Sequence, residues 1–404
     1  MRVQLITHSY LPERTPPQRR WAAFVEAFRA EGWDVDIVVP PADPGHVPGA
    51  RPTGGEVHRR GPWGERIHRT LRWPALRGTR EGRFLGHIVH AVAAIPVGLR
   101  AQRPDVIVIT VPALPTVVAG WTLSRLRRVP LIIEMRDAWP DLARESGVST
   151  GMLSRVMEAL VTGTQRTADL VVTVTEGFAE RLRERGLDRV EVVGNGVPLA
   201  DIPLLPTRTR APGQLNVLYL GNHGESQGLE TVIRAAGLVH GGPEGIVVRF
   251  VGSGTRHAAL AELNASLGSP VQMLPPAHGA DLQEQYAWAD TCLVTLRPDW
   301  PSFEWTVPSK TYELLAVGRH VTGIVTGEAA RILESSGAAT LVAASPQALV
   351  EVWRLLAKEP DATNVDGHGR EWVGRHADLP QLGRRFVERA RDTVLRHSDP
   401  GHPL

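Results

Sequence analysis

Apolar runs alternate with amphipathic stretches through the first half of the chain. Nearly continuous apolar runs predict strands at 3–7, 35–40, 105–112, 130–137, 169–175 and 190–196. Between the first two runs, Trp21, Phe24 and Val25 recur at helical spacing, and Gly32 follows as a stop signal. Further helices are expected at 113–127 and 150–167. Strands that are apolar on both faces are typical of a parallel sheet covered by helices.

The pattern breaks at 200–214, where ADIPLLPTRTRAPGQ has three prolines and no regular period, which predicts a linker. After it, strands are expected at 215–221, 246–254, 271–276 and 290–296, with helices at 228–240, 255–267 and 280–289. The sequence therefore predicts two doubly wound α/β halves, 1–199 and 215–380, and a helix at 381–397 that crosses back to the first half. Ligands of such sheets bind outside the carboxyl ends of the strands, so two facing halves would hold a ligand in a cleft.

Composition indicates a globular protein without a membrane span. The 404 residues are 42% hydrophobic and 22% charged, and the formal net charge of +2 gives no reason to expect nucleic acid as a partner. The longest apolar stretch, 84–99, is too short to cross a bilayer. The single cysteine, Cys292, lies in an apolar run and is expected to be a small core residue, which fits a reducing, cytoplasmic location.

Two glycine-rich turns follow predicted strands of the second half. GNHGESQGLETVI (221–233) and VGSG (251–254) each place glycines where a strand gives way to a helix. Glycine lets backbone N–H groups approach a phosphate beside a helix N-terminus. Neither stretch has the P-loop or dinucleotide spacing. The sequence alone fits two interpretations of these stretches, a phosphate-binding turn and a plain tight turn.

Charged residues mark two further places. Arg136 and Asp137 end a predicted strand, on the side where ligands bind, although a surface ion pair is the alternative. The chain has only two lysines, Lys310 and Lys358, and Lys310 falls in the first turn of a helix expected from about 308 to Gly318. A cation at the positive end of a helix suggests that an anion such as diphosphate binds there, with Glu313 complementing the helix dipole or accepting hydrogen bonds from ribose hydroxyls.

The order of these motifs resembles glycosyltransferase family 4, which has the GT-B fold. The matching stretches are PE with the arginines that follow (12–20), RDAWPD, NGV, GNHGESQGLET, VGSG, PSKTYELLAVGR and GEAARIL. Within the family they resemble the branch of amino-sugar transferases of bacterial surface polysaccharide assembly. The resemblance implies a retaining, metal-independent transferase without a cofactor, which moves a sugar from a nucleoside diphosphate, UDP being favoured, to a hydroxyl acceptor.

The resemblance also implies roles for individual residues. Donor binding is expected at Gly221, Asn222, Gly224, Gly252, Gly254, Ser309, Lys310 and Glu313. In the first half, Asp137 and Arg136 are expected to be catalytic. Acceptor or phosphate contacts are expected at Arg19, Arg20, Glu304, Arg256 and Arg297.

The chain departs from the family pattern in ways that keep two other functions open. Trp305, with Glu304 beside it, stands where the family often has glutamate, and Asn222 and Gln227 stand where many members carry cations. A nucleotide-sugar epimerase of the same fold would need acid and base groups; His8 and His223 sit at loop ends but have no evident partners in the sequence. An inactive subunit that binds nucleotide sugar or another transferase is the third possibility.

Residues 59–83 are strongly basic. They hold eight arginines against Glu65 and Glu81, a local formal charge of +6, and Trp63 and Trp73 lie among them. Arginine and tryptophan together suit the lipid headgroup region. We therefore expect this segment to bind the anionic inner face of a membrane, where the acceptor could be lipid-linked. A solvated basic loop, or one that closes over an anionic soluble acceptor, is the alternative.

Overall fold

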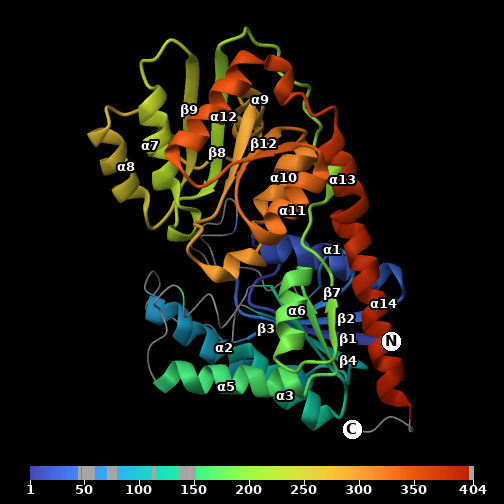
Figure 1. Ribbon diagram of the computed structural model, residues 1–404. Coiled ribbons are helices and arrows are strands. Elements are labelled where there is room, and N and C mark those ends of the chain that lie inside the picture. Colours follow the sequence, from blue (N-terminus) through green and yellow to red (C-terminus); the bar gives the residue numbers. More distant parts are fainter. Residues whose placement is uncertain are drawn as a thin grey trace. The chain divides into compact units, whose positions relative to one another are not determined.

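The computed structural model describes residues 1–43, 47, 60–70, 80–111, 115–136, 145 and 152–399, with the backbone alone at 80–81, 83–84 and 152–157 (Figure 1). Its contacts divide the chain into two units. Unit 1 comprises Met1–Asn195 and Leu379–Leu404, and unit 2 comprises Gly196–Asp378. The last helix of the chain is therefore part of the first unit.

Unit 1 contains a parallel sheet of seven strands in the order β3-β2-β1-β4-β5-β6-β7. The strands are β1 (Arg2–Ile6), β2 (Asp34–Val39), β3 (Arg66–Arg69), β4 (Val106–Val111), β5 (Leu131–Met135), β6 (Leu170–Thr173) and β7 (Val190–Val192). The helices are α1 (Pro16–Ala30), α2 (Arg80–Arg100), α3 (Pro115–Arg127), α5 (Met152–Arg166), α6 (Glu176–Glu184) and α14 (Leu379–Ser398). The order reverses between β1 and β4, which makes the carboxyl ends of these strands the switch point of the sheet.

Helices α1 and α14 lie side by side and close the core of unit 1 (Figure 1). Thr15 caps α1 by accepting a hydrogen bond from the Gln18 backbone N–H. Phe386 of α14 packs among Trp21, Phe24 and Phe28 of α1, with ring centroids 5.2–6.1 Å apart. Such aromatic contacts add to the stabilisation from burial alone.

Unit 2 contains a parallel sheet of six strands in the order β10-β9-β8-β11-β12-β13. The strands are β8 (Gln214–Asn222), β9 (Gly245–Ser253), β10 (Val271–Leu274), β11 (Thr291–Thr295), β12 (His320–Ile324) and β13 (Ala339–Leu341). The longer helices are α7 (Leu229–Val239), α8 (His257–Ser266), α9 (Ala280–Trp288), α10 (Lys310–Val317), α11 (Gly327–Ser336), α12 (Pro346–Lys358) and α13 (His368–His376). Short 3-10 turns lie at Leu199–Asp201, Glu225–Gln227, Pro301–Glu304 and Pro360–Thr363.

Helices cover both faces of the unit 2 sheet. Val217 and Tyr219 of β8 belong to a core with α7 and α12, whereas Leu218 belongs to a core with α10 and α13. Alternate residues of one strand thus point into opposite apolar layers. The predicted class, two successive doubly wound α/β halves, is confirmed. Cys292 is buried and free, as expected of a small core residue.

The expected linker at 200–214 is packed against unit 2. The Leu205 N–H donates to the Val317 carbonyl at 3.0 Å. The Arg210 guanidinium is buried, donates to the Leu356 carbonyl at 2.8 Å and lies 3.5 Å from the Asp290 carboxylate. The proline-rich composition therefore did not indicate a free linker, because Arg210 ties the segment to unit 2 through contacts distant in sequence.

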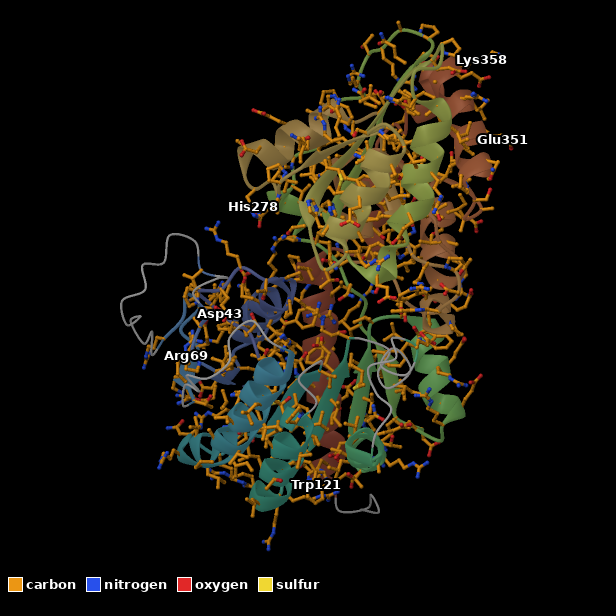
Figure 2. All side chains as sticks on the ribbon, turned by 90° about the vertical axis from the view of Figure 1, so that its left-hand side faces the viewer. Asp43, Arg69, Trp121, His278, Glu351 and Lys358 are labelled. Carbon is orange, nitrogen blue, oxygen red and sulfur yellow. The ribbon has the colours of Figure 1, made fainter. Side chains whose placement is uncertain are left out.

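Part of the basic segment 59–83 is also folded into the core. β3 is an edge strand in which Arg66 donates two hydrogen bonds to the buried Asp36 carboxylate, at 2.8 and 2.7 Å. Arg69, labelled in Figure 2, donates to the Pro40 carbonyl at 2.7 Å, and Trp63 packs against the core of unit 1. Arg59 and residues 71–79 lie outside the described residues. The alternative of a solvated basic loop therefore does not hold for 66–69, and membrane binding by this segment stays a prediction.

Candidate functional site

Several of the predicted donor-binding residues lie at the carboxyl ends of the unit 2 strands. Gly221 and Asn222 end β8, and Gly252 is paired with Gly221 near the end of β9. Lys310 opens α10, which follows β11. Because the sheet is parallel, all these strand ends lie at one edge, where ligands of doubly wound sheets bind.

The glycines at this edge let two loops touch. A Cβ on Gly252, whose φ is +152°, would lie 1.9 Å from the Gly221 carbonyl oxygen. A Cβ on Gly254 would lie 2.5 Å from the His223 carbonyl oxygen. Close backbone approach is thus a structural reason for both glycines. It accounts for them without a ligand, and their role in phosphate binding stays a prediction.

Gln227 occupies a backbone N–H of the loop after β8 that could otherwise bind a phosphate. The Gly224 N–H donates to the Gln227 side-chain oxygen at 3.1 Å, so this amide already has a partner within the loop. Asn222 is packed against the same turn, since a Cβ on Gly224 would lie 2.4 Å from its side-chain nitrogen. Gly228 follows in the left-handed conformation, with φ +59°, and opens α7.

The first turn of α10 holds a compact polar group. The buried Tyr286 hydroxyl of α9 donates to Glu313 Oε1 at 2.7 Å. Lys310 Nζ donates to Glu313 Oε2 and to the Tyr286 oxygen, both at 3.2 Å. Glu313 thus supplies negative charge beside Lys310, so the lysine does not by itself require a bound anion. The side chains of Lys310 and Glu313 are 29% and 18% exposed and therefore remain accessible.

The other lysine gives a useful contrast. Lys358 is exposed at the last position of α12 and lies at the surface (Figure 2). A cation there complements the negative end of the helix. Ser309 is the residue before α10 and makes no side-chain capping bond. Lys310, in contrast, lies at the positive N-terminal end of α10, where a cation is unfavourable. Its contacts with Glu313 and Tyr286 offset this cost.

Two arginines line a cavity of about 400 Å³ beside this edge, together with Gly228 and Thr295. Arg256 pairs with Glu230 at 2.8 Å, and Arg297 pairs with Asp299 at 2.6 Å. Both arginines are thus placed where an anion could bind, but each already has a carboxylate partner.

Glu304 contacts residues that lie just after β12. Its Oε1 accepts a hydrogen bond from Thr326 at 2.7 Å. Its backbone carbonyl lies against Gly327, where a Cβ would come within 1.9 Å. These contacts place the Glu304 loop on the start of α11.

His223 has a partner that the sequence did not reveal. Its Nδ1 lies 2.9 Å from Nδ1 of His257, and the two rings stack with centroids 5.1 Å apart. Burial, and then the neighbouring His257, lower the pKa of His223 to about 4. Such a contact requires one nitrogen to donate and the other to accept. The expectation that His223 lacks a partner is therefore wrong.

In unit 1, Arg20 has a structural role. Its Nε donates to the buried Glu134 carboxylate at 2.7 Å, and its two terminal nitrogens donate to the carbonyls of Val193 and Gly194. Only 2% of Arg20 is exposed, so the predicted acceptor or phosphate contact has no support in this arrangement. Arg19 is exposed on α1.

Of the predicted catalytic pair Arg136 and Asp137, only Arg136 belongs to the described residues. Arg136 follows β5 directly, at the carboxyl edge of the sheet. Asp137 lies outside the described residues. Its proposed contact with acceptor or sugar stays a prediction.

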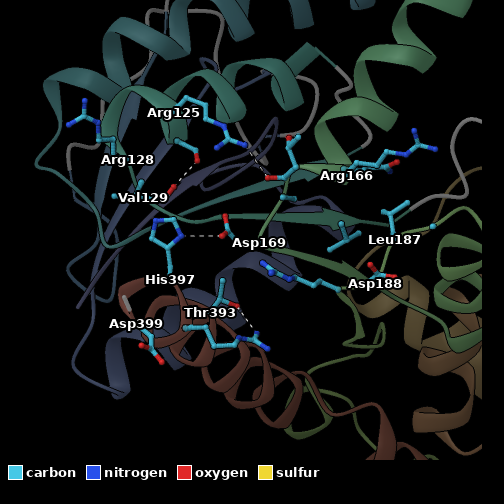
Figure 3. A pocket seen from close by; sticks show the side chains of 18 residues that line it. Arg125, Arg128, Val129, Arg166, Asp169, Leu187, Asp188, Thr393, His397 and Asp399 are labelled. Carbon is cyan, nitrogen blue, oxygen red and sulfur yellow. Dashed lines mark hydrogen bonds and ion pairs between the residues drawn. The ribbon is translucent and has the colours of Figure 1, made fainter. Parts of the chain in front are cut away.

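A cavity lies at the opposite edge of the unit 1 sheet, where its strands begin. It measures about 900 Å³ and is lined by residues that precede β5, β6 and β7 (Figure 3). His397 contacts Asp169 there, at 3.1 Å. Arg125, Arg166 and Arg396 belong to the last turns of α3, α5 and α14, where cations complement the helix dipole. None of the described residues that line this cavity is a predicted site residue.

The described residues contain no cluster of three or more His, Cys, Asp or Glu that could hold a metal ion. In the same part of the chain, no helix has both the length and the apolar character to cross a bilayer.

Comparison with protein families identifies two matching domains. The description "Glycosyl transferase 4-like domain" matches residues 17–196, and "Glycosyl transferases group 1" matches residues 214–359. The two matches fall on the two sheets and together cover most of the chain.

Individual proteins show the same likeness. One relative, WcaI of Escherichia coli K12, is named for a glycosyl transferase role in colanic acid biosynthesis; it is 24% identical over 97% of this chain and 100% of its own. A sucrose-phosphate synthase of Thermosynechococcus elongatus has a TM-score of 0.75 at 17% identity, covering 98% and 99% of the two chains. Anabaena HepE in complex with UDP-glucose has a TM-score of 0.66 at 15% identity, covering 97% and 100%.

Proposed function

Because the chain belongs to glycosyltransferase family 4 and has its GT-B fold, we propose that it is a retaining transferase that moves a sugar from a UDP-sugar to a hydroxyl acceptor. The observation that carries this proposal is the polar group of Lys310, Glu313 and Tyr286 at the strand edge of unit 2. It places a cation, a carboxylate and a helix N-terminus together, which is the chemistry that a nucleoside diphosphate needs.

Donor binding would rearrange this polar group. Lys310 has three N–H donors and would turn toward the diphosphate. The diphosphate offers these donors more negative charge than the single Glu313 carboxylate does. Glu313 Oε2 would then accept hydrogen bonds from ribose hydroxyls, while Tyr286 keeps Oε1 in place. Preference for UDP is supported by the similar HepE structure, whose bound molecule is UDP-glucose.

Transfer would depend on charge stabilisation and positioning. The leaving diphosphate itself would take the proton of the acceptor hydroxyl on the face from which it departs, so that no protein nucleophile is needed. Lys310 and helix N-termini would stabilise the charge that develops on the diphosphate, without a metal ion. Arg136 and Asp137 are the residues that we propose to touch the acceptor or the transferred sugar.

The proposed pathway is surface polysaccharide assembly with a lipid-linked acceptor, at the cytoplasmic face of a membrane. The relative named for colanic acid biosynthesis supports the first part. A stripe on α2 supports the second, since Leu85, Ile88, Val92 and Leu99 are all exposed and recur at helical spacing. This stripe begins just after the basic segment, whose described part is folded into unit 1.

Nucleotide release tests the enzymatic proposal. The full chain is incubated with UDP-sugars and GDP-sugars, and free nucleotide is measured with and without candidate acceptors. Glu313→Gln should abolish donor binding, whereas Glu371→Gln, a matched change in the first turn of α13, should leave it intact. Sugar isomerisation without an acceptor would instead indicate an epimerase. Binding without release or isomerisation would indicate an inactive partner subunit.

Vesicle co-sedimentation tests the membrane proposal. Replacing Ile88 and Val92 by serine should release the protein from anionic vesicles, whereas Leu395→Ser, an equally exposed leucine on α14, should not. Equal binding by both variants would contradict a role for the α2 stripe.

A further inference from the structure

Basic side chains gather at the switch point of the unit 1 sheet. His8 follows the carboxyl end of β1, and Arg136 follows that of β5, with β4 between the two strands. His87 of α2 stands edge-on to His8, with ring centroids 6.3 Å apart. In doubly wound sheets the crevice at such a point receives a ligand.

Two polar atoms of this cluster have no hydrogen-bond partner in the described part of the chain. His8 Nδ1 and Arg136 Nε are both buried and unpartnered among the described residues. Buried donors and acceptors are nearly always satisfied in proteins, and an exception calls for an explanation. A ligand that brings its own oxygen atoms to the cluster would satisfy both.

Among the described residues, no carboxylate pairs with Arg136. Glu134, the acid nearest in sequence within β5, is occupied by Arg20 and by the Thr110 hydroxyl, at 2.7 Å each. Burial, then His87, then Arg136 lower the pKa of His8 to about 4. Within the part of the chain that the structure describes, the cluster thus presents a guanidinium without an ion-pair partner and a neutral imidazole.

We propose that His8 and Arg136, with His87 beside them, form a subsite for an anionic group of the acceptor, a phosphate or a carboxylate. The proposal rests on the transferase function and specifies its substrate: a hydroxyl acceptor that carries negative charge. Arg136 would donate to the anion through its planar guanidinium. His8 would donate its single N–H to the same group.

Anion titration of the full chain tests this directly. The probes are inorganic phosphate and glucuronate, with glucose as the neutral comparison, and the variants are His8→Asn and Arg136→Gln. Arg100→Gln is the control, an exposed arginine at the far end of α2. Loss of a hydrogen bond to a charged group should weaken anion binding by about tenfold in the first two variants and leave the control unchanged.

A pH series separates a binding role from a merely structural one. A bound anion favours protonated His8, so affinity should rise between about pH 7 and about pH 5, and this rise should disappear in His8→Asn. The groups that face His8, namely His87, His90, Glu134 and Arg136, are unchanged in that variant. Vesicles with and without phosphatidic acid distinguish a lipid phosphate from a free anion.

The outcomes are distinct. Binding of a free anion that depends on His8 and Arg136 supports a soluble anionic acceptor, and binding of phosphatidic acid alone with the same dependence supports a lipid phosphate. No anion binding, or binding that both variants retain, overturns the subsite. UDP titration is run in parallel, because wild-type protein that binds anions but not UDP would overturn the transferase proposal and leave the subsite standing.

Discussion

Gly252→Ala is a direct test of how the loops that follow β8 and β9 are held together. The added Cβ would lie 1.9 Å from the Gly221 carbonyl oxygen, whereas carbon–oxygen contacts in proteins begin at about 3.3 Å. The obstacle is backbone, so it cannot turn away as a flexible side chain would. Either β8 and β9 separate at their ends or the loop after one of them moves.

The size of the effect follows from two terms. A non-glycine residue in a rarely populated backbone conformation such as φ +152° costs about 1–3 kcal/mol, and overpacking adds about 1–3 kcal/mol. We therefore expect the free energy of unfolding to fall by about 2–6 kcal/mol. UDP affinity should fall with it, since the displaced residues include Gly221.

Equilibrium urea unfolding measures this, with Gly163→Ala as the control. Gly163 is in α5, has no atom within 4 Å of an added Cβ and should gain about 0.5–1 kcal/mol from the better helix former. A Gly252→Ala protein that unfolds within about 0.5 kcal/mol of wild type, a change typical of neutral surface sites, would refute the account of the loop packing.

Other changes test single contacts. Lys310→Ala should weaken UDP binding more than uridine binding in calorimetric titrations if the lysine binds the diphosphate, as we propose; equal losses would contradict this. Arg20→Met should cost about 3–5 kcal/mol in urea unfolding by leaving Glu134 unpaired, and a double variant with Glu134→Gln should recover most of it. Burial holds the pKa of His320 at about 4, below its ordinary 6.5, so the unfolded chain binds the proton first as pH falls. His320 should therefore contribute stability that is complete above pH 6.5 and falls by about 2 kcal/mol at about pH 5, and an unchanged pH slope in His320→Gln would count against it.

The sequence predicted those elements whose pattern is local. Strands such as β4 are apolar at every position because both faces are covered, and this leaves a plain signal. β3 was missed because its sequence, RIHR, is mostly polar: Arg66 and His68 both reach Asp36 of the neighbouring strand. That pairing connects residues about thirty positions apart and has no local pattern.

The same reasoning applies to the candidate site. Lys310 and Glu313 were found because a cation and an acid in one helical turn are visible in sequence. Tyr286 was missed, since it lies on another helix and only the fold brings its hydroxyl to Glu313. His223 and His257 are likewise brought together by the ends of β8 and β9. Local sequence shows which residues could do chemistry, and the fold determines which of them meet.

The last helix of the chain imposes an order on synthesis. Unit 2 is a continuous stretch, Gly196–Asp378, so all of its strands have left the ribosome before α14 has been made. Unit 1 starts first but ends last, because Phe386 and Leu382 of α14 belong to its core. Until α14 has been synthesised, the aromatic side chains of α1 lack the apolar residues that pack against them in the folded unit. The growing chain thus exposes Trp21 and Phe24 through most of translation, and a stop at 378 would leave them exposed for good.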